Sequence, residues 1–173
     1  AEIHQRTQSS AYHPQQRHDV RLVYHELIDN VLLHAAGISG PETPYATLPE
    51  DAPIELTLHE KANRLTLTVA DNHGRLHART VWQRLQYQFS PRGVHSFSGR
   101  GLYLTYRLGL RVLIRIWPGR RTEINVLLLK DPAREDPRLL QLEPRPLVVL
   151  EVDGEPPRPS DRPGATPERG IHP

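Results

Sequence analysis

The stretch YHELIDNVLLHA occupies residues 24–35 and determines how the chain is organised. Upstream and within it, Val20, Val23, Leu27 and Val31 recur at helical spacing, which predicts the buried stripe of an amphipathic helix. A proline at position 14 can begin such a helix, because a first-turn proline loses no intrahelical hydrogen bond, and a glycine at position 37 can end it. We therefore predict one long helix over about residues 14–36.

Two polar side chains on this helix are candidates for metal binding and proton transfer. Glu26 and Asn30 are four residues apart, so they lie on one helix face. The Asn30 side-chain oxygen is a neutral, hard ligand that suits Mg²⁺, and Glu26 could orient or deprotonate a hydroxyl or water that attacks a phosphate. On the helix alone, a solvated helix edge is the better explanation, because short motifs have a high false-positive rate.

Length and composition limit the class of protein. A chain of 173 residues corresponds to about one domain, and 37% hydrophobic with 24% charged residues is typical of a globular protein. No apolar run approaches the length of a membrane span, and no signal peptide is evident, so we expect no membrane partner and a cytoplasmic location. The absence of cysteine excludes disulfides, thiolate catalysis and cysteine-based zinc sites.

The charge balance does not favour a nucleic-acid partner. The net charge is only +2, and the basic residues are almost all arginine. The densest basic region contains Arg111, Arg115, Arg120 and Arg121, and a solvated hairpin explains it better than a phosphate-binding surface, because aromatic stacking platforms do not interleave with it.

The remaining patterns predict helices and strands in blocks. Alternating residues from Ile54 to Leu58 and from Leu65 to Val69 predict an antiparallel hairpin, and its second strand ends at Asp71. Further elements are expected as a helix at 76–88, a loop at 89–98, a helix to about 108, and strands around 112–116 and 124–128. Because no βαβ unit repeats, we predict an α+β fold: a two-layer sandwich with a mixed, mainly antiparallel sheet and helices on one face.

The domain boundaries follow the composition. Residues 1–13 are polar and are expected to form an arm or linker, and residues 14–130 are expected to form the domain. Residues 131–173 form a proline-rich tail in which the apolar segment 146–152 could add an edge strand or dock on a partner. Beyond Gly154 we expect disorder.

A second glycine-bearing motif is Gly99-Arg100-Gly101, which precedes a predicted helix. The free N–H groups and the dipole of a helix N-terminus favour an anion, and glycines let the backbone approach a phosphate closely. The motif lacks the third glycine of a dinucleotide-binding fingerprint and the Gly-Lys-Ser/Thr ending of a Walker loop. Taken alone, it is better explained as a turn.

The ordered combination of motifs is more informative than any one of them. Over roughly residues 18–130, the helix with Glu26-x-x-x-Asn30, the strand ending in Asp71, the Gly99-x-Gly101 helix start and the sequence RTEINV at 121–126 resemble the GHKL (Bergerat-fold) ATP-binding superfamily. Within that superfamily the chain looks most like the compact anti-sigma-factor serine kinases.

This resemblance implies ATP and Mg²⁺ as cofactors and a role for each matching residue. Asn30 would bind the metal, Glu26 would be the catalytic or water-positioning acid, and Asp71 would accept a hydrogen bond from the adenine amino group. The remaining nucleotide-binding positions implied are Gly74, Gly99, Arg100, Gly101 and Thr122. Arg100 could reach a phosphate, although an exposed salt bridge explains it as well.

The chain departs from the family in the first glycine box, where His73 and Arg75 occupy the two glycine positions and Gly74 lies between them. The leading hypothesis is a bacterial signalling regulator, a serine/threonine protein kinase or partner-switching protein that docks a sigma-factor-like or antagonist-like protein. The alternative is a degenerate GHKL domain that acts as a protein-interaction or dimerisation module, for example in a homodimer. A histidine-kinase catalytic module is disfavoured by the short segment between Asp71 and Gly99.

Overall fold

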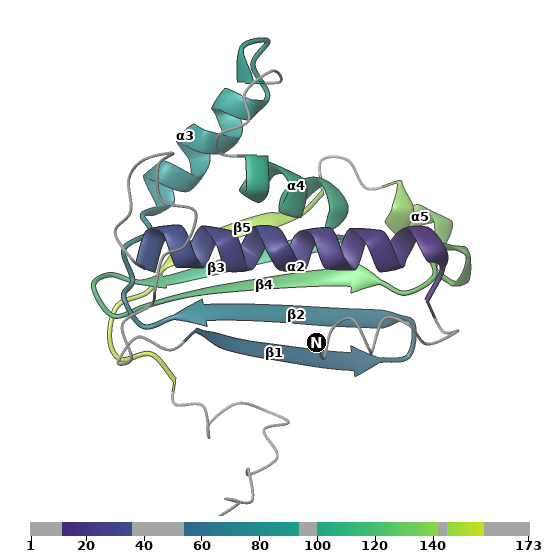
Figure 1. Ribbon diagram of the computed structural model, residues 1–173, viewed down its shortest axis with the longest axis horizontal. Helices are drawn as coiled ribbons and strands as arrows, with labels where there is room; N and C mark the ends of the chain where they lie inside the picture. The colour runs from purple at the N-terminus through teal and green to yellow at the C-terminus, as the bar shows by residue number, and fades with distance from the viewer. Residues whose placement is uncertain (1–11, 36–53, 94–99, 142–144, 158–173) are drawn as a thin grey trace, which may run out of the picture.

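The structure is a computed structural model that describes residues 12–35, 54–93, 100–141 and 145–157 (Figure 1). The predicted arm before residue 12, the loop 36–53, part of the predicted loop at 94–99 including Gly99, and the tail after residue 157 lie outside the described residues. In chain order the elements are α2 (Pro14–Ala35), β1 (Glu55–Lys61), β2 (Arg64–Asp71), α3 (Ala78–Gln88), α4 (Arg100–Leu108), β3 (Arg111–Trp117), β4 (Arg121–Leu129), the 3₁₀ turn η2 (Pro132–Arg134), α5 (Pro137–Leu140) and β5 (Leu147–Glu151).

The five strands form one mixed sheet in the order β1-β2-β4-β3-β5. Neighbours among the first four are antiparallel, and β5 pairs parallel to β3 at the edge. The predicted α+β class with a mixed, mainly antiparallel sheet is therefore confirmed. The segment that pairs as β5 follows the proline-rich boundary at residue 131, so the sheet draws on the chain beyond the predicted domain limit.

The core lies between one face of the sheet and the helices. Alternate residues of the three central strands are buried on that face and align in rows, because the register pairs Leu67 with Val126 and Ile114 with Ile124. Buried residues of α2 and α3 and half-buried residues of α4 belong to the same apolar cluster. In Figure 1, α2 runs along the strands over the sheet, α4 lies beside α2, and α3 extends away from the sheet.

Helix α2 begins at Pro14, as predicted, and the four residues of its expected stripe, Val20, Val23, Leu27 and Val31, are all buried. This stripe packs into the core with the buried residues of the strands. Helix α3 begins at Ala78 rather than at 76, because His77 adopts an extended backbone conformation at the helix N-cap. Among the helices of the described segments, none has the length and apolar character that crossing a bilayer requires.

The opposite face of the sheet is polar around Arg121. The Arg121 guanidinium donates two hydrogen bonds to Glu55 on β1, at 2.7 and 2.8 Å, and one to the side-chain oxygen of Asn72, at 2.8 Å. The bond to Glu55 raises the pKa of Arg121, with smaller effects of the same sign from Glu123 and Asp71. Arg121 of β4 thereby ties the loop that follows Asp71 to β4 and, through Glu55, to β1.

Candidate functional site

A pocket lies between α2, the ends of β2 and β4, and the helices α3 and α4. It is mostly apolar, with a few polar groups, which is the usual make-up of a small-molecule site. Three of the predicted site residues, Asn30, Asp71 and Thr122, meet in it. Its lining residues are Leu27, Asn30, Val31, Asp71, His73, Arg75, Leu76, Arg84, Leu102, Thr122 and Ile124.

Asp71 is the last residue of β2 and is buried. Its Oδ1 atom accepts hydrogen bonds from the backbone N–H groups of His73, at 2.8 Å, and Gly74, at 3.1 Å. Such an Asx-type turn fixes the carboxylate against the backbone. Within the described segments both of these bonds end on Oδ1, so Oδ2 remains as the acceptor for a ligand.

Thr122 lies directly opposite Asp71 in the antiparallel pairing of β2 and β4. Its side chain is almost fully buried, at 3% exposure, yet its Oγ1 atom has no hydrogen-bond partner among the described residues. The buried Nε2 atom of His73 has none there either. Leaving a buried polar group unpaired costs about 1–3 kcal/mol, and a polar ligand in the pocket could supply a partner to each of these two atoms.

Gly74 has a different structural role. Its φ of +57° is in the left-handed region, and a Cβ atom there would meet the carbonyl oxygen of Trp117 and the backbone nitrogen of Arg120, the latter at 2.6 Å. Its carbonyl accepts a hydrogen bond from Gly119 N–H at 3.1 Å. Gly74 therefore lets the loop after Asp71 pack against the β3–β4 turn, and it is not among the residues that line the pocket.

The predicted motifs of α2 and α4 are in direct contact. The Asn30 side-chain amide donates a hydrogen bond of 2.6 Å to the backbone carbonyl of Glu26, which leaves the Asn30 Oδ1 atom for a cation. A Cβ atom on Gly101 would lie 2.5 Å from both Glu26 Oε2 and Asn30 Nδ2. Glycine at this position lets the first turn of α4 approach the two polar side chains of α2.

The Glu26 carboxyl has a raised pKa. Partial burial raises its pKa above the ordinary value, and the negative charge of Asp29 adds to this effect, whereas His25 acts in the opposite direction. A carboxylate with a raised pKa is a better proton acceptor near neutral pH than an ordinary one. This property agrees with a general base but does not require one.

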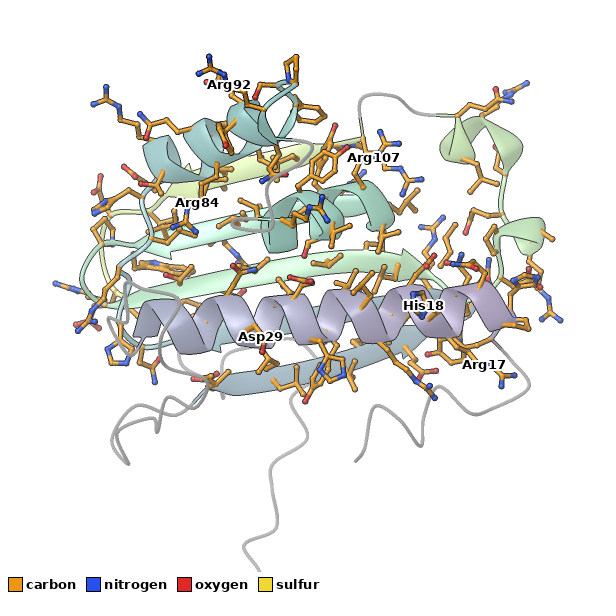
Figure 2. All side chains as sticks on the ribbon, turned by 45° about the horizontal axis from the view of Figure 1, so that its top comes forward. Arg17, His18, Asp29, Arg84, Arg92 and Arg107 are labelled. Atoms are coloured by element: carbon orange, nitrogen blue, oxygen red, sulfur yellow. The ribbon has the colours of Figure 1, made fainter. Side chains whose placement is uncertain are left out.

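Arginines contribute positive charge at the pocket. Arg75 and Arg84 both line it, and Figure 2 shows Arg84 on the α3 side of the sheet. Arg100 is half-buried at the first position of α4, next to Gly101. Arg75, Arg84 and Arg100 each make an interaction with the protein, so a bound anion would share them with those contacts.

The pocket is narrow. It measures about 550 Å³ out to its open mouth, but the space that can hold the centres of water molecules is only about 40 Å³. A single water needs roughly 10–15 Å³ by the latter measure, so the hollow accommodates a few waters rather than a purine ring. A planar ligand would have to displace side chains such as His73 or Leu102.

Within the ranges that the structure describes, no group of three or more His, Asp or Glu side chains is arranged to hold a metal ion. Any cation at Asn30 would therefore depend on oxygens supplied by a ligand and by water, as Mg²⁺ commonly does.

Sequence reasoning missed two features of this site. Arg84 was not singled out, although it follows the buried Val81 by three positions and so lies at the border of the inward helix face. The contact of Gly101 with Glu26 joins residues far apart in the sequence, and no local pattern could reveal it.

No model of a known protein family matches the chain, and no curated protein matches it either.

Proposed function

We propose that this protein binds an adenine nucleotide with Mg²⁺ in the pocket between α2, β2, β4 and α4, as a regulator of the anti-sigma-factor serine kinase type with a Bergerat fold. The observation that carries the proposal is the Asp71–Thr122 pair: a buried carboxylate with a spare oxygen beside a buried hydroxyl without a partner among the described residues. Such a pair offers an acceptor and a donor to the edge of a heterocycle.

The chemistry of the pocket supports an adenine ring. The apolar side chains of Leu27, Val31 and Ile124 would contact its faces. The Asp71 Oδ2 atom would accept from the exocyclic amino group, and guanine, which carries an oxygen at that position, would leave the carboxylate facing another acceptor. Such a mismatch of buried polar groups supports strong discrimination.

The phosphate end would lie toward Asn30 and the first turn of α4. Asn30 Oδ1 would supply one oxygen to Mg²⁺. The N-terminal N–H groups of α4 would face the phosphates. When bound, Mg²⁺ supplies charge neutralisation of the phosphate oxygens.

Glu26 is the proposed proton acceptor. Positioned one helical turn before Asn30, its carboxylate would take the proton of an attacking serine or threonine hydroxyl as that oxygen bonds to the terminal phosphorus and ADP leaves. The hydroxyl would belong to a regulatory protein that docks on this domain, a sigma-factor-like or antagonist-like partner.

A second candidate function is a degenerate domain that no longer binds nucleotide and acts as a protein-interaction or dimerisation module. Two observations favour it: His73 lines the pocket where the family has glycine, and the space for water centres is only about 40 Å³. In that case the unpaired Thr122 and His73 atoms would be a cost without a function.

Calorimetric titration separates the two functions. ATP and ADP would be titrated with and without Mg²⁺ into the protein and into Asp71→Asn. Micromolar, Mg²⁺-dependent binding to the wild type that is lost in Asp71→Asn supports the first proposal. No heat at millimolar nucleotide from a protein that is folded by circular dichroism supports the second.

A further inference from the structure

An apolar groove lies on the other side of α3 from the pocket just described. It is lined by α3, by Tyr106 of α4 and by the residues that lead into β5, namely Arg145, Pro146 and Leu147. The space open to water centres is about 490 Å³, far more than in the pocket beside Asp71. The groove therefore has room for several apolar side chains from a partner.

The α3 wall of the groove carries two aromatic side chains that are exposed to solvent. Trp82, Gln86 and Phe89 follow at intervals of four and three, so they share one helix face. Trp82 is 44% exposed and Phe89 is 56% exposed. Clustered exposed aromatic residues beside a groove are a recurrent mark of protein interaction sites.

Exposed arginines lie toward both ends of α3, and the Glu151 carboxylate of β5 accepts a hydrogen bond of 2.8 Å from the N–H of Ala78 at the start of this helix. Residues 72–122 contain ten arginines and no Asp or Glu, but Arg115 and Arg121 pair with Glu123 and Glu55 on the sheet and so do not contribute to the groove. Arg79 precedes Trp82 by three positions and so extends the exposed face of α3. Figure 2 shows Arg92 at the outer end of α3 and Arg107 near α4.

We infer that this groove docks an acidic, amphipathic segment of a partner protein, with apolar side chains packing between Trp82 and the edge-to-face pair of Phe89 and Tyr106 and with Asp or Glu side chains meeting Arg79 and Arg92. Charge complementarity of this kind steers association and excludes partners of the wrong sign. An apolar groove is the usual receptor for the apolar face of an amphipathic helix. The inference does not depend on nucleotide binding.

The contacts favour a protein segment over nucleic acid. The groove is lined mainly by carbon, and its one cationic lining residue, Arg145, already donates to the carbonyl oxygens of Leu108, at 3.2 Å, and Gly109, at 2.9 Å. A phosphate backbone needs cations along its path, whereas apolar side chains need the carbon-rich lining that is present.

Tryptophan fluorescence gives a direct test, because Trp82 borders the groove whereas the second tryptophan, Trp117, is buried on β3. The probe is a synthetic helical peptide of about 16 residues with leucines at i, i+3, i+4 and i+7 flanked by glutamates. We expect saturable binding with a blue shift of the Trp82 emission. A peptide of the same composition in scrambled order and a version with lysine in place of glutamate should each bind at least about tenfold more weakly.

Exposed substitutions locate the site without disturbing the core. Phe89→Ser and Arg92→Glu should each weaken binding about tenfold or more. Arg120→Glu, an equal charge change at the exposed β3–β4 turn, and Leu150→Ser, a loss of exposed apolar surface on β5, should leave it within about twofold.

Four results would overturn the inference. The first is the absence of binding to the acidic peptide by folded protein, and the second is equal binding of the scrambled or lysine peptide. The third is single-stranded oligonucleotide binding that Arg92→Glu abolishes while the acidic peptide fails to bind, which would make the groove a nucleic-acid site. The fourth is a dimer in sedimentation velocity that Phe89→Ser dissociates, which would make a second copy the occupant.

Discussion

Asp71 and Thr122 lie directly opposite each other on the antiparallel strands β2 and β4, and their side chains line the same pocket. The Asp71 carboxylate is held through Oδ1 by two backbone N–H groups, whereas the buried Thr122 hydroxyl has no partner within the described residues. The fold thus positions the Asp71 carboxylate, whereas the unpaired Thr122 hydroxyl lowers the free energy of unfolding. Stability and ligand affinity should therefore respond in opposite ways to substitution at Thr122.

Thr122→Val tests this opposition. Valine has the shape of threonine without the hydroxyl, so the free protein should gain about 1 kcal/mol in free energy of unfolding. Adenine-nucleotide affinity should fall by about tenfold, because the donor to the ring is lost. Urea unfolding and calorimetry on the same samples measure both quantities. A less stable Thr122→Val variant would show that Oγ1 has a partner in the free protein.

Two substitutions of Asp71 separate its structural and binding roles. Asp71→Asn keeps one oxygen that can accept from the N–H groups of His73 and Gly74, so the fold should be retained. An NH₂ group, which is a hydrogen-bond donor, replaces the second oxygen. Asp71→Ala removes both acceptors and should cost about 1–3 kcal/mol of stability. Thermal unfolding of the two variants is the measurement, and equal destabilisation would contradict the role given to Oδ1.

Gly74→Ala should be strongly destabilising. The substitution combines a φ of +57° with backbone atoms of Trp117 and Arg120 that cannot move aside, so we expect a loss of about 3 kcal/mol or more.

Gly119→Ala is the matched control for this substitution. Gly119 also has a positive φ, +69°, but nothing lies within 4 Å of its Cβ position, so only the backbone strain of about 1 kcal/mol remains. Chemical denaturation of both variants gives the comparison. Similar losses would mean that the contact with the β3–β4 turn is unimportant.

Gly101→Ala should impair the site more than the fold. The added Cβ would press on the ends of two side chains, Glu26 and Asn30, which can turn aside, and alanine gains about 1 kcal/mol of helix propensity over glycine. We therefore expect near-unchanged stability and loss of Mg²⁺-dependent nucleotide binding by about tenfold or more. Nucleotide affinity equal to that of the wild type would show that Glu26 and Asn30 do not contact the ligand.

The raised pKa of Glu26 predicts a pH dependence of stability. Because the folded protein holds this proton more tightly than the unfolded chain, the folded state loses stability as pH rises from the ordinary pKa of the carboxyl toward the raised one. Glu26→Gln removes this effect, so the variant should exceed the wild type in stability at neutral pH and lose that advantage in acid below the ordinary pKa. Denaturant midpoints across the pH range test it, and an advantage that grows in acid would contradict the sign.

The fold was predictable where one side of an element is buried. Buried residues at helical spacing identify α2, namely Val20, Val23, Leu27 and Val31. Buried residues at every second position identify β2, namely Leu65, Leu67 and Val69. The parallel pairing of β5 with β3 was not predictable in this way, because a strand pattern does not determine its partner. The position of Asp71 at a strand end was visible in the sequence, whereas the packing of Gly74 against Trp117 and Arg120 depends on a tertiary contact.

The most direct test of the central claim compares ATP with a purine nucleoside triphosphate that lacks the 6-amino group, each with Mg²⁺, by equilibrium dialysis on the wild type and on Asp71→Asn. If the Asp71 carboxylate accepts from the adenine amino group, the wild type should prefer ATP by about tenfold or more, and the preference should vanish in Asp71→Asn. Equal affinity of the wild type for both nucleotides, or a preference for ATP that survives in Asp71→Asn, would contradict the account.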